Sequence, residues 1–252
     1  MYDTANRKQV LTDAKSNTVT YTYDVNNNMV QIDEVEKSDL GNPDQLFTTT
    51  YDYDHLDRRI KSIDNVTNTI EYAYDSRNNG TRMTDALGNV TRHEYDGLNR
   101  LVKTIRDLTD DGTGNGVVID AIAIEQVWDD SSRLVSMTDD NTNTTSYAYD
   151  ALDRKRSATY ADGTVHSQTY DIYDNITQRI DANGSIVSNL SDDLDRVTLR
   201  SIVPGVGVSS NTAFKIYQYD GLSRLVYAQD DDSAITRSYD SLSHAIEEVL
   251  NG

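Results

Sequence analysis

The residues of this chain that could do acid–base chemistry are, first, its many aspartates. One aspartate recurs in every unit of a regular pattern, at Asp3, Asp24, Asp54, Asp75, Asp96, Asp129, Asp150, Asp171, Asp192, Asp220 and Asp240. If these positions repeat in successive hairpins, neighbouring carboxylates lie two strand spacings, roughly 10 Å, apart. Acid–base pairs of the glycosidase kind need about 5 to 10 Å and unequal environments. A carboxylate that is the same in every unit is therefore predicted to be architectural, and no catalytic residue is assigned.

The four histidines do not form a candidate site either. They fall at different phases of the pattern and in different units, at His55, His93, His166 and His244. A catalytic or metal-binding cluster needs its members to converge on one point. The sequence therefore favours structural roles for these side chains and predicts no cofactor.

One acidic segment, residues 107–120, can be compared with a calcium-binding loop. Asp107, Thr109 and Asp111 fit the first, third and fifth positions of an EF-hand loop, and Gly112 fits the sixth. The twelfth position is Val118, where such a loop requires a bidentate glutamate. A plain acidic turn-rich loop is the favoured interpretation, so no metal ligand is assigned.

The elements that must position these residues repeat along the whole chain. The pair Tyr-Asp opens at residues 53, 74 and 95, a spacing of 21 residues. With this pair as positions 0 and +1, units begin at residues 2, 23, 53, 74, 95, 128, 149, 170, 191, 219 and 239. Such a period is typical of a stacked array in which no unit can bury its apolar face alone. We predict a single array over residues 1–252, with loop insertions near residues 33–46, 107–121 and 201–213.

Two further positions complete the predicted structural motif. Position 0 is an aromatic residue except at Ser191, namely Tyr2, Tyr23, Tyr53, Tyr74, Tyr95, Trp128, Tyr149, Tyr170, Tyr219 and Tyr239. Position +5 is an arginine in seven units, namely Arg7, Arg58, Arg100, Arg133, Arg154, Arg196 and Arg224. In the other four units it is Asn28, Asn79, Asn175 or His244.

The residue period within a unit is that of β-strands. Before the motif, aromatic residues alternate with small or polar ones, as in Tyr72-Ala73-Tyr74. After it, position +7 is β-branched in nine of the eleven units, which predicts a second strand. Turn residues such as Gly and Asn recur near +11 to +15. Each unit is therefore predicted to be an antiparallel β-hairpin, and eleven of them give about 22 strands in an elongated, curved, all-β strip.

The motif lies on the turn inside each hairpin. Positions 0 and +5 face each other across a four-residue loop, so the arginine is predicted to lie on the tyrosine ring of its own unit, worth roughly 0.5 to 2 kcal/mol. The aspartate is predicted to accept hydrogen bonds from loop N–H groups and from the arginine. A leucine at +3 is predicted to fold the loop back against its neighbour, at Leu56, Leu98, Leu152, Leu194, Leu222 and Leu242.

The composition excludes several functional classes. The 23 basic and 42 acidic residues give a formal charge of -19, which disfavours binding to nucleic acids and anionic membranes. Without cysteine, disulfides and thiol catalysis are excluded. No apolar run is long enough for a membrane span, and the N-terminus lacks the plan of a signal peptide, so any targeting signal is expected outside this sequence.

The phased YDxxxR units, with DxxGN-type turns between them, resemble the YD-repeat, or Rhs-repeat, family over essentially the whole chain. That family includes bacterial Rhs proteins, shell components of toxin complexes and the extracellular part of teneurins. The resemblance implies a spiral shell of hairpins, in which bacterial members hold a toxic C-terminal region until delivery. Bacterial shells usually end in a self-cleavage motif with Asp-Pro pairs, whereas the prolines here are Pro43 and Pro204, after Asn42 and Val203. The chain thus resembles a wall segment without cargo, plug or protease.

The function implied by this resemblance is a non-catalytic shell segment of a secreted or surface-delivered bacterial protein that encapsulates a toxic or effector region. The implied partners are the remainder of the same polypeptide, as cargo or core, and other shell segments, and open strand edges add edge-to-edge self-association. An alternative is a cell-surface adhesion module whose tyrosine rows bind carbohydrate or a protein receptor. A third possibility, a β-solenoid polysaccharide-degrading enzyme, lacks any acidic or basic constellation that departs from the repeat.

Overall fold

All regular elements in the described part of the chain, residues 1–38, 42–209 and 212–251 of a computed structural model, are β-strands. The prediction of an all-β protein made of antiparallel hairpins is confirmed. Among these residues, no helix has the length and apolar character needed to cross a membrane.

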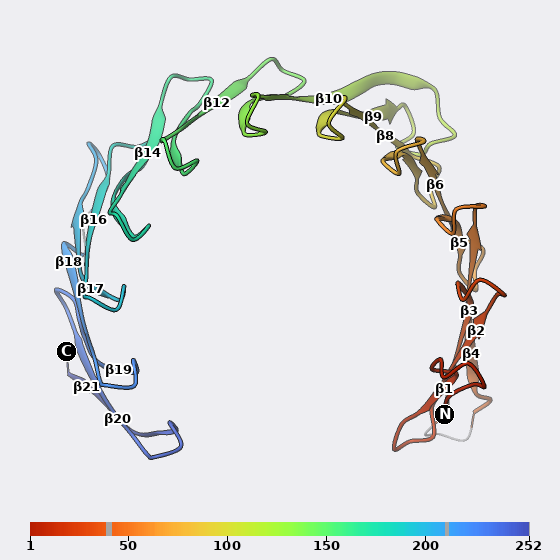
Figure 1. Cartoon of the computed structure of the whole chain (residues 1–252), viewed down its shortest axis with the longest axis horizontal. Helices are drawn as coiled ribbons and strands as arrows, with labels where there is room; N and C mark the ends of the chain where they lie inside the picture. The colour runs from red at the N-terminus through yellow and green to blue at the C-terminus, as the bar shows by residue number, and fades with distance from the viewer. Residues whose placement is uncertain (39–41, 210–211, 252) are drawn as a thin grey trace. The chain divides into compact units, whose positions relative to one another are not determined.

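The strands fall into two compact units. The first comprises Met1–Gln126 together with Asp139–Asn141. Its strands form an antiparallel meander, because β2 to β9 each pair with the strand before and the strand after (Figure 1). They are β1 (Val10–Thr12), β2 (Thr18–Tyr23), β3 (Met29–Glu36), β4 (Gln45–Tyr53), β5 (Arg59–Ile63), β6 (Thr69–Tyr74), β7 (Gly80–Thr84), β8 (Val90–Tyr95), β9 (Leu101–Thr109) and β10 (Val118–Trp128).

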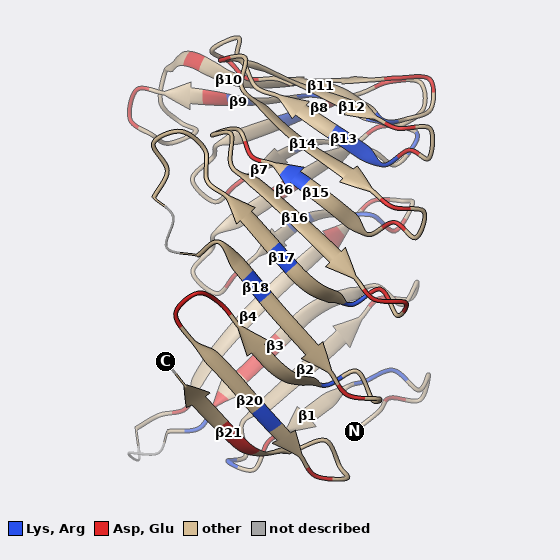
Figure 2. Cartoon of the chain, turned by 90° about the vertical axis from the view of Figure 1, so that its left-hand side faces the viewer, with Lys and Arg blue, Asp and Glu red and all other residues tan. Residues whose placement is uncertain are grey.

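The second unit comprises Val127–Thr138 and Thr142–Gly252 and is a meander of the same kind. In Figure 2 the turns that follow β14, β16, β18 and β20 succeed one another along one edge of its sheet, and they carry acidic residues. Its strands are β11 (Leu134–Thr138), β12 (Thr144–Tyr149), β13 (Lys155–Thr159), β14 (Val165–Tyr170), β15 (Ile176–Ile180), β16 (Ile186–Ser191), β17 (Val197–Val203), β18 (Phe214–Tyr219), β19 (Leu225–Gln229), β20 (Ala234–Tyr239) and β21 (Ala245–Asn251).

The Tyr-Asp hairpins share one register. In the hairpin of β6 and β7, Tyr74 pairs with Gly80 and Ala73 pairs with Arg82, so Thr81 is an extra residue in a β-bulge. The same shift occurs in eight further hairpins, and it places the residue at +7 in the bulge. The repeat in sequence is therefore also a repeat in backbone geometry.

The described residues form 21 strands, against the 22 expected. The missing strand belongs to the first repeat, which begins at Tyr2. There Tyr2 and Lys8 form only an isolated bridge. The insertion predicted near residues 33–46 lengthens β3 and β4, and the one near 107–121 lengthens β9 and β10. The one near 201–213 lies between β17 and β18. Residues 39–41 and 210–211 of these insertions lie outside the described residues.

Neither unit has a conventional core. Of the described residues, only Ala158 and Ser185 are buried, at 5% and 8% exposure. Most side chains on the strands are half-buried, because each unit is a single layer of strands rather than two packed layers. Contacts between successive hairpins must therefore supply much of the stabilisation that a core supplies elsewhere.

Candidate functional site

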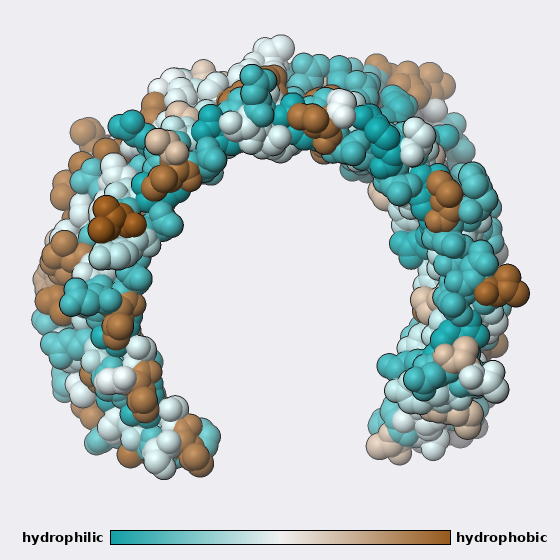
Figure 3. Space-filling view, viewed as in Figure 1, coloured by the Kyte–Doolittle hydropathy of each residue, from teal (hydrophilic) through white to brown (hydrophobic). Residues whose placement is uncertain are grey.

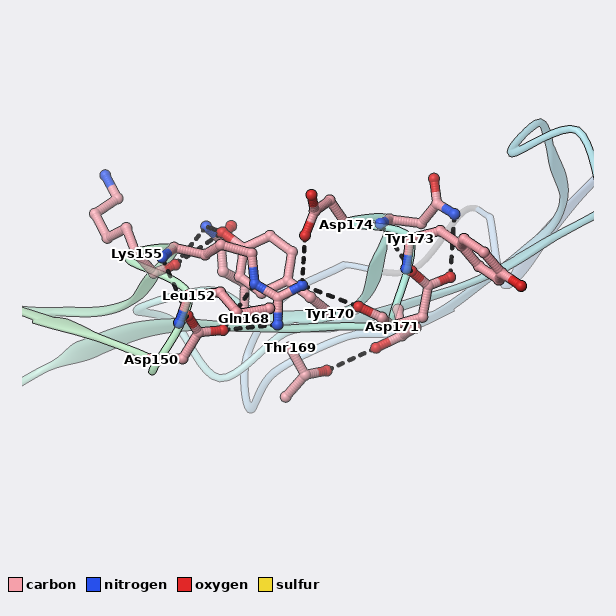
Figure 4. A network of polar contacts seen from close by, with 12 residues as sticks. Asp150, Leu152, Lys155, Gln168, Thr169, Tyr170, Asp171, Tyr173 and Asp174 are labelled. Atoms are coloured by element: carbon pink, nitrogen blue, oxygen red, sulfur yellow. Dashed lines mark hydrogen bonds and ion pairs between the residues drawn. The ribbon is translucent and has the colours of Figure 1, made fainter.

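Each Tyr-Asp turn is closed by its own aspartate. In the hairpin of β12 and β13, Asp150 Oδ1 accepts hydrogen bonds from the backbone N–H groups of Leu152 (2.9 Å) and Arg154 (3.1 Å). The other oxygen, Oδ2, accepts one from Arg154 Nε at 2.8 Å (Figure 4). The bond from the N–H at +3 is present in all eleven units. The carboxylate thus satisfies loop donors that no strand partner reaches.

These hydrogen bonds favour the charged form of the aspartates. The side-chain hydrogen bond from Arg58, with the backbone N–H groups of Arg58 and Leu56, lowers the pKa of Asp54 to about 2, against an opposing effect of desolvation. The pKa is lowered at all eleven +1 positions. The aspartates are therefore ionised at neutral pH, which suits hydrogen-bond acceptors and does not suit proton donors.

A further position of the turn, +4, was missed by the sequence analysis. It has a positive φ in every unit, between 59° and 71°. The residues are Asn6, Asn27, Asp57, Asn78, Asn99, Ser132, Asp153, Asp174, Asp195, Ser223 and Ser243. Asn and Asp adopt this left-handed conformation more readily than other non-glycine residues. The restriction of +4 to Asn, Asp and Ser was the available signal.

The arginine at +5 connects its own turn to the next hairpin. Arg154 Nη1 donates to the carbonyl oxygen of Asp171 (2.9 Å) and to Asp174 Oδ1 (2.7 Å), both in the following turn (Figure 4). Its guanidinium lies 4.5 Å from the centre of the Tyr170 ring. The same stacking on the tyrosine of the next unit occurs at Arg7, Arg58, Arg133, Arg196 and Arg224. We call this set of contacts the hairpin clamp.

The tyrosine at position 0 completes the clamp from the other side. The Tyr170 hydroxyl donates to the carbonyl oxygen of Lys155, residue +6 of the preceding unit, at 2.9 Å. The equivalent bond to +6 of the preceding unit is made by Tyr23, Tyr53, Tyr74, Tyr95, Tyr149, Tyr219 and Tyr239. Each of these tyrosines therefore spans the junction between two hairpins.

Two predictions about this motif are wrong. The arginine does not lie on the tyrosine of its own unit, because its Nε and Nη2 are held by its own aspartate and its Nη1 donates to the next turn, which places the guanidinium on the next ring. The leucines at +3 do not fold back against a neighbour, since they are 53% to 75% exposed. The turn is already closed by backbone and aspartate hydrogen bonds, so its tip needs no apolar contact. In Figure 3 hydrophobic side chains appear as separate patches among hydrophilic ones.

The clamp is incomplete where the residue at +5 is asparagine. Asn28, Asn79 and Asn175 bind their own aspartate, and each donates to the +4 side chain of the next turn, at 2.7 to 3.0 Å. After Asn175 the next position 0 is Ser191, so both the arginine and the ring are missing there. A cavity of about 350 Å³ lies at this junction, lined by Asp171, Tyr173, Asn175, Ser191, Asp192, Asp193 and Asp195.

The remaining candidate residues contact individual side chains near them and do not converge on one site. His93 Nδ1 lies 3.1 Å from Thr104 Oγ1, and His244 Nδ1 lies 3.0 Å from Asp240 Oδ2. In the segment compared with a calcium loop, Asp107 forms a bidentate ion pair with Arg92 at 2.6 and 2.7 Å. Within the described ranges, no three His, Asp or Glu side chains form a group that could hold a metal ion. These residues therefore stay dispersed, whereas the hairpin clamp recurs from one hairpin to the next.

The fold and the clamp define a repeat protein in which most β-hairpins are joined to the next by the same set of side chains. A family model described as RHS Repeat matches residues 74–113 and 128–165. The predicted resemblance to the YD-repeat, or Rhs-repeat, family is confirmed over these segments. Among curated proteins, no sequence matches the chain.

Solved structures similar to this chain include components of Tc toxins. One is TcdB2–TccC3 without the hypervariable C-terminal region, with a TM-score of 0.48 and 12% identity. Another is the Photorhabdus luminescens Tc holotoxin pore carrying the TccC3 D651A mutation, with a TM-score of 0.46 and 12% identity. Both similarities cover 98% of this chain and 19% of the other chain. This chain therefore spans about a fifth of the length of those proteins.

Proposed function

We propose that this chain is a non-catalytic wall segment of a bacterial Rhs-type shell that encloses a toxic or effector polypeptide. The observation that carries the proposal is the hairpin clamp, which uses most of the repeated charged and aromatic side chains to join hairpins. In the turn at Asp54, the arginine, aspartate and backbone are all engaged with each other or with the next turn. A residue set that binds its own neighbours is suited to building a wall.

The tyrosines two residues before the motif also support a wall more than an adhesion module. Arg59 lies 5.5 Å from the centre of the Tyr51 ring and 5.2 Å from that of Tyr72. Lys155 lies 5.6 Å from the Tyr147 ring. These rings therefore make contacts within the sheet, whereas a carbohydrate platform needs ring faces that are open to a ligand.

The partners proposed for this wall are the rest of the same polypeptide and neighbouring wall segments, in a secreted or surface-exposed protein. Strand pairings among the described residues give β1 a single partner, β2, and β21 a single partner, β20. Every residue of β21 is exposed. Such edges carry backbone groups that can pair with another strand, so the isolated chain is expected to associate edge to edge. Sedimentation that stays monomeric as concentration rises would contradict this.

The shell proposal can be tested on the natural protein that contains this chain. Limited proteolysis should leave the enclosed polypeptide intact in the wild type. Arg154→Ala combined with Arg196→Ala loosens two clamps, so cleavage of the enclosed polypeptide should become faster. The matched control is Arg156→Ala, because Arg156 lies on β13 and takes part in no clamp. Equal cleavage of that polypeptide in the wild type and as an isolated piece would refute the proposal.

A further inference from the structure

Three cations gather on one sheet face of the second unit. Arg179 on β15, Arg200 on β17 and Lys215 on β18 surround a groove of about 330 Å³. The other lining residues are Ile176, Val187, Asn189 and Ile202. In Figure 2 the basic segments of β17 and β18 lie next to each other. The chain as a whole carries a formal charge of -19, so a concentration of positive charge at one place runs against its composition. We call this feature the basic groove.

Two of these cations oppose each other directly. In the pairing of β17 with β18, Arg200 and Lys215 are register partners, and like charges at such positions destabilise a sheet. Arg200 Nε donates to Asn189 Oδ1 at 3.0 Å, and that acceptor is neutral. No hydrogen bond or ion pair joins the Lys215 ammonium to another described residue. The two adjacent positive charges are therefore not neutralised by a contacting carboxylate.

The acidic groups near the groove form their contacts with other residues. Asp181 Oδ1 lies 3.1 Å from Arg179 Nε and 3.4 Å from His166 Nδ1, so its charge is directed to these two side chains. Asp230 is the acid whose charge acts on Lys215. Its Oδ1 is occupied by the N–H and hydroxyl of Ser233 at 2.9 and 3.1 Å. Arg179 therefore has a carboxylate partner, and Lys215 has a counter-charge nearby in Asp230. No hydrogen bond or ion pair joins Arg200 to a described carboxylate, so the Arg200–Lys215 pair keeps an excess of positive charge.

The groove lies on the same face as the hairpin clamp. Lys215, Tyr217 and Tyr219 alternate along β18, so their side chains project from one face. Tyr219 is the ring on which Arg196 stacks, at 4.8 Å. Tyr217 and Lys215 also line a second depression together with Ile235 and Leu250. Gln229, Asp230 and Ser233 line this depression as well, so the hollow next to the cations continues along the face with mixed apolar and polar side chains.

From these observations we propose that the basic groove binds an extended polypeptide segment in which acidic and aliphatic residues alternate. The carboxylates of such a segment complement Arg200 and Lys215, and its aliphatic side chains cover Ile176, Val187 and Ile202. The groove volume is at the lower end of the range for ligand pockets, about 300 to 1,000 Å³, which suits two or three side chains. The inference rests on the groove and does not require the shell proposal.

The test measures peptide binding by the whole chain. The probe is a blocked, fluorescently labelled peptide that alternates valine and glutamate, and its control has glutamine in place of glutamate. The glutamate peptide should bind about tenfold more tightly at low ionic strength, and the difference should shrink near 0.15 M salt. Arg200→Gln and Lys215→Gln should each weaken binding about threefold to tenfold. Arg156→Gln, which removes the same charge outside the groove, should leave affinity unchanged.

An unfolding measurement distinguishes a binding role of Arg200 and Lys215 from a purely structural one, in which Arg200→Gln would lower the unfolding midpoint. Removing one member of a like-charge pair should leave the unfolding midpoint of Arg200→Gln unchanged or raised while binding is lost. A lowered midpoint together with lost binding would overturn the proposal. So would equal binding of the two peptides, or a loss in Arg156→Gln as large as in Arg200→Gln. Displacement of the peptide by citrate at equal concentration would instead assign a small-anion site, and tighter binding of heparin would assign a polysaccharide site.

Discussion

The junction between Asn175 and Ser191 is the place where the hairpin clamp can be rebuilt. Asn175→Arg with Ser191→Tyr restores the pattern seen at Arg154 and Tyr170. The new tyrosine hydroxyl would take the carbonyl of Ile176, which now accepts Asn189 Nδ2 at 3.0 Å. At the intact junction the carbonyl oxygen of Lys155 accepts both Gln168 Nε2 at 2.8 Å and the Tyr170 hydroxyl at 2.9 Å. The new bond would therefore be added to an acceptor that is already engaged and would contribute less than the usual ~1 kcal/mol.

The net stabilisation comes from the pairing of the two new side chains. A guanidinium over the ring contributes about 0.5 to 1 kcal/mol. Its hydrogen bonds to the next turn add roughly 0.5 to 1 kcal/mol after allowance for solvent exposure. The double variant should gain about 1 to 2 kcal/mol, which for a chain of this size raises the melting temperature by roughly 2 to 8 °C. Ser191→Tyr alone should gain almost nothing because it lacks the cation, whereas Asn175→Arg alone should gain only its hydrogen bonds to the next turn because it lacks the ring.

Equilibrium urea unfolding of the wild type, both single variants and the double variant gives the coupling energy directly. The control is Asn175→Arg with Ser191→Phe, which keeps the ring and leaves the Asn189 hydrogen bond in place. This control should be about as stable as the tyrosine version. Additive effects of the two single changes, or a double variant no more stable than the wild type, would refute the account of the clamp.

Other parts of the turn make separate predictions. The folded pKa of Asp54, about 2, lies below its ordinary value of 3.8, so its stabilisation is complete above the ordinary value and is lost as the pH falls toward 2. Circular dichroism should show acid unfolding in that window, and a transition centred above pH 5 would contradict this origin. Replacing Asp75 and Asp96 together by alanine should lower the urea midpoint more than Tyr74→Phe, and the reverse order would show that the hydroxyl outweighs the carboxylates. Ser223 has φ 63°, so Ser223→Val should cost about 1 to 3 kcal/mol while Ser223→Asn costs nothing. Equal midpoints for these two variants would argue against strain at +4.

The strands and turns were predictable because their signals are local. Alternation in Tyr72-Ala73-Tyr74 places β6, and the aspartate at +1 marks the turn that follows it. The partner of the arginine was not predictable in the same way. In sequence, Arg154 is five residues from Tyr149 and sixteen from Tyr170, so the nearer ring looked like the partner. The aspartate that fixes one side of the guanidinium was predicted, but the position of the next hairpin beside this turn is set by the pairing of the strands and cannot be read from the local sequence.

The basic groove illustrates a second limit. Arg200 and Lys215 are separated by an insertion whose length gives no indication of the strand register. Only the pairing of β17 with β18 brings them opposite each other. A charge count over the sequence gives an acidic protein and hides a local excess of the opposite sign.

The direction of the clamp has a consequence for how the chain folds during synthesis. Each arginine reaches forward, to a tyrosine sixteen residues later at Tyr74, Tyr149 and Tyr170. A hairpin that has just left the ribosome therefore meets a neighbour that already presents its arginine and its carbonyl. Contacts this close in sequence favour fast folding that proceeds by addition of one unit at a time. Nascent chains of increasing length should gain protease resistance in steps of one hairpin, whereas resistance that appears only at full length would mean that the array forms as a whole.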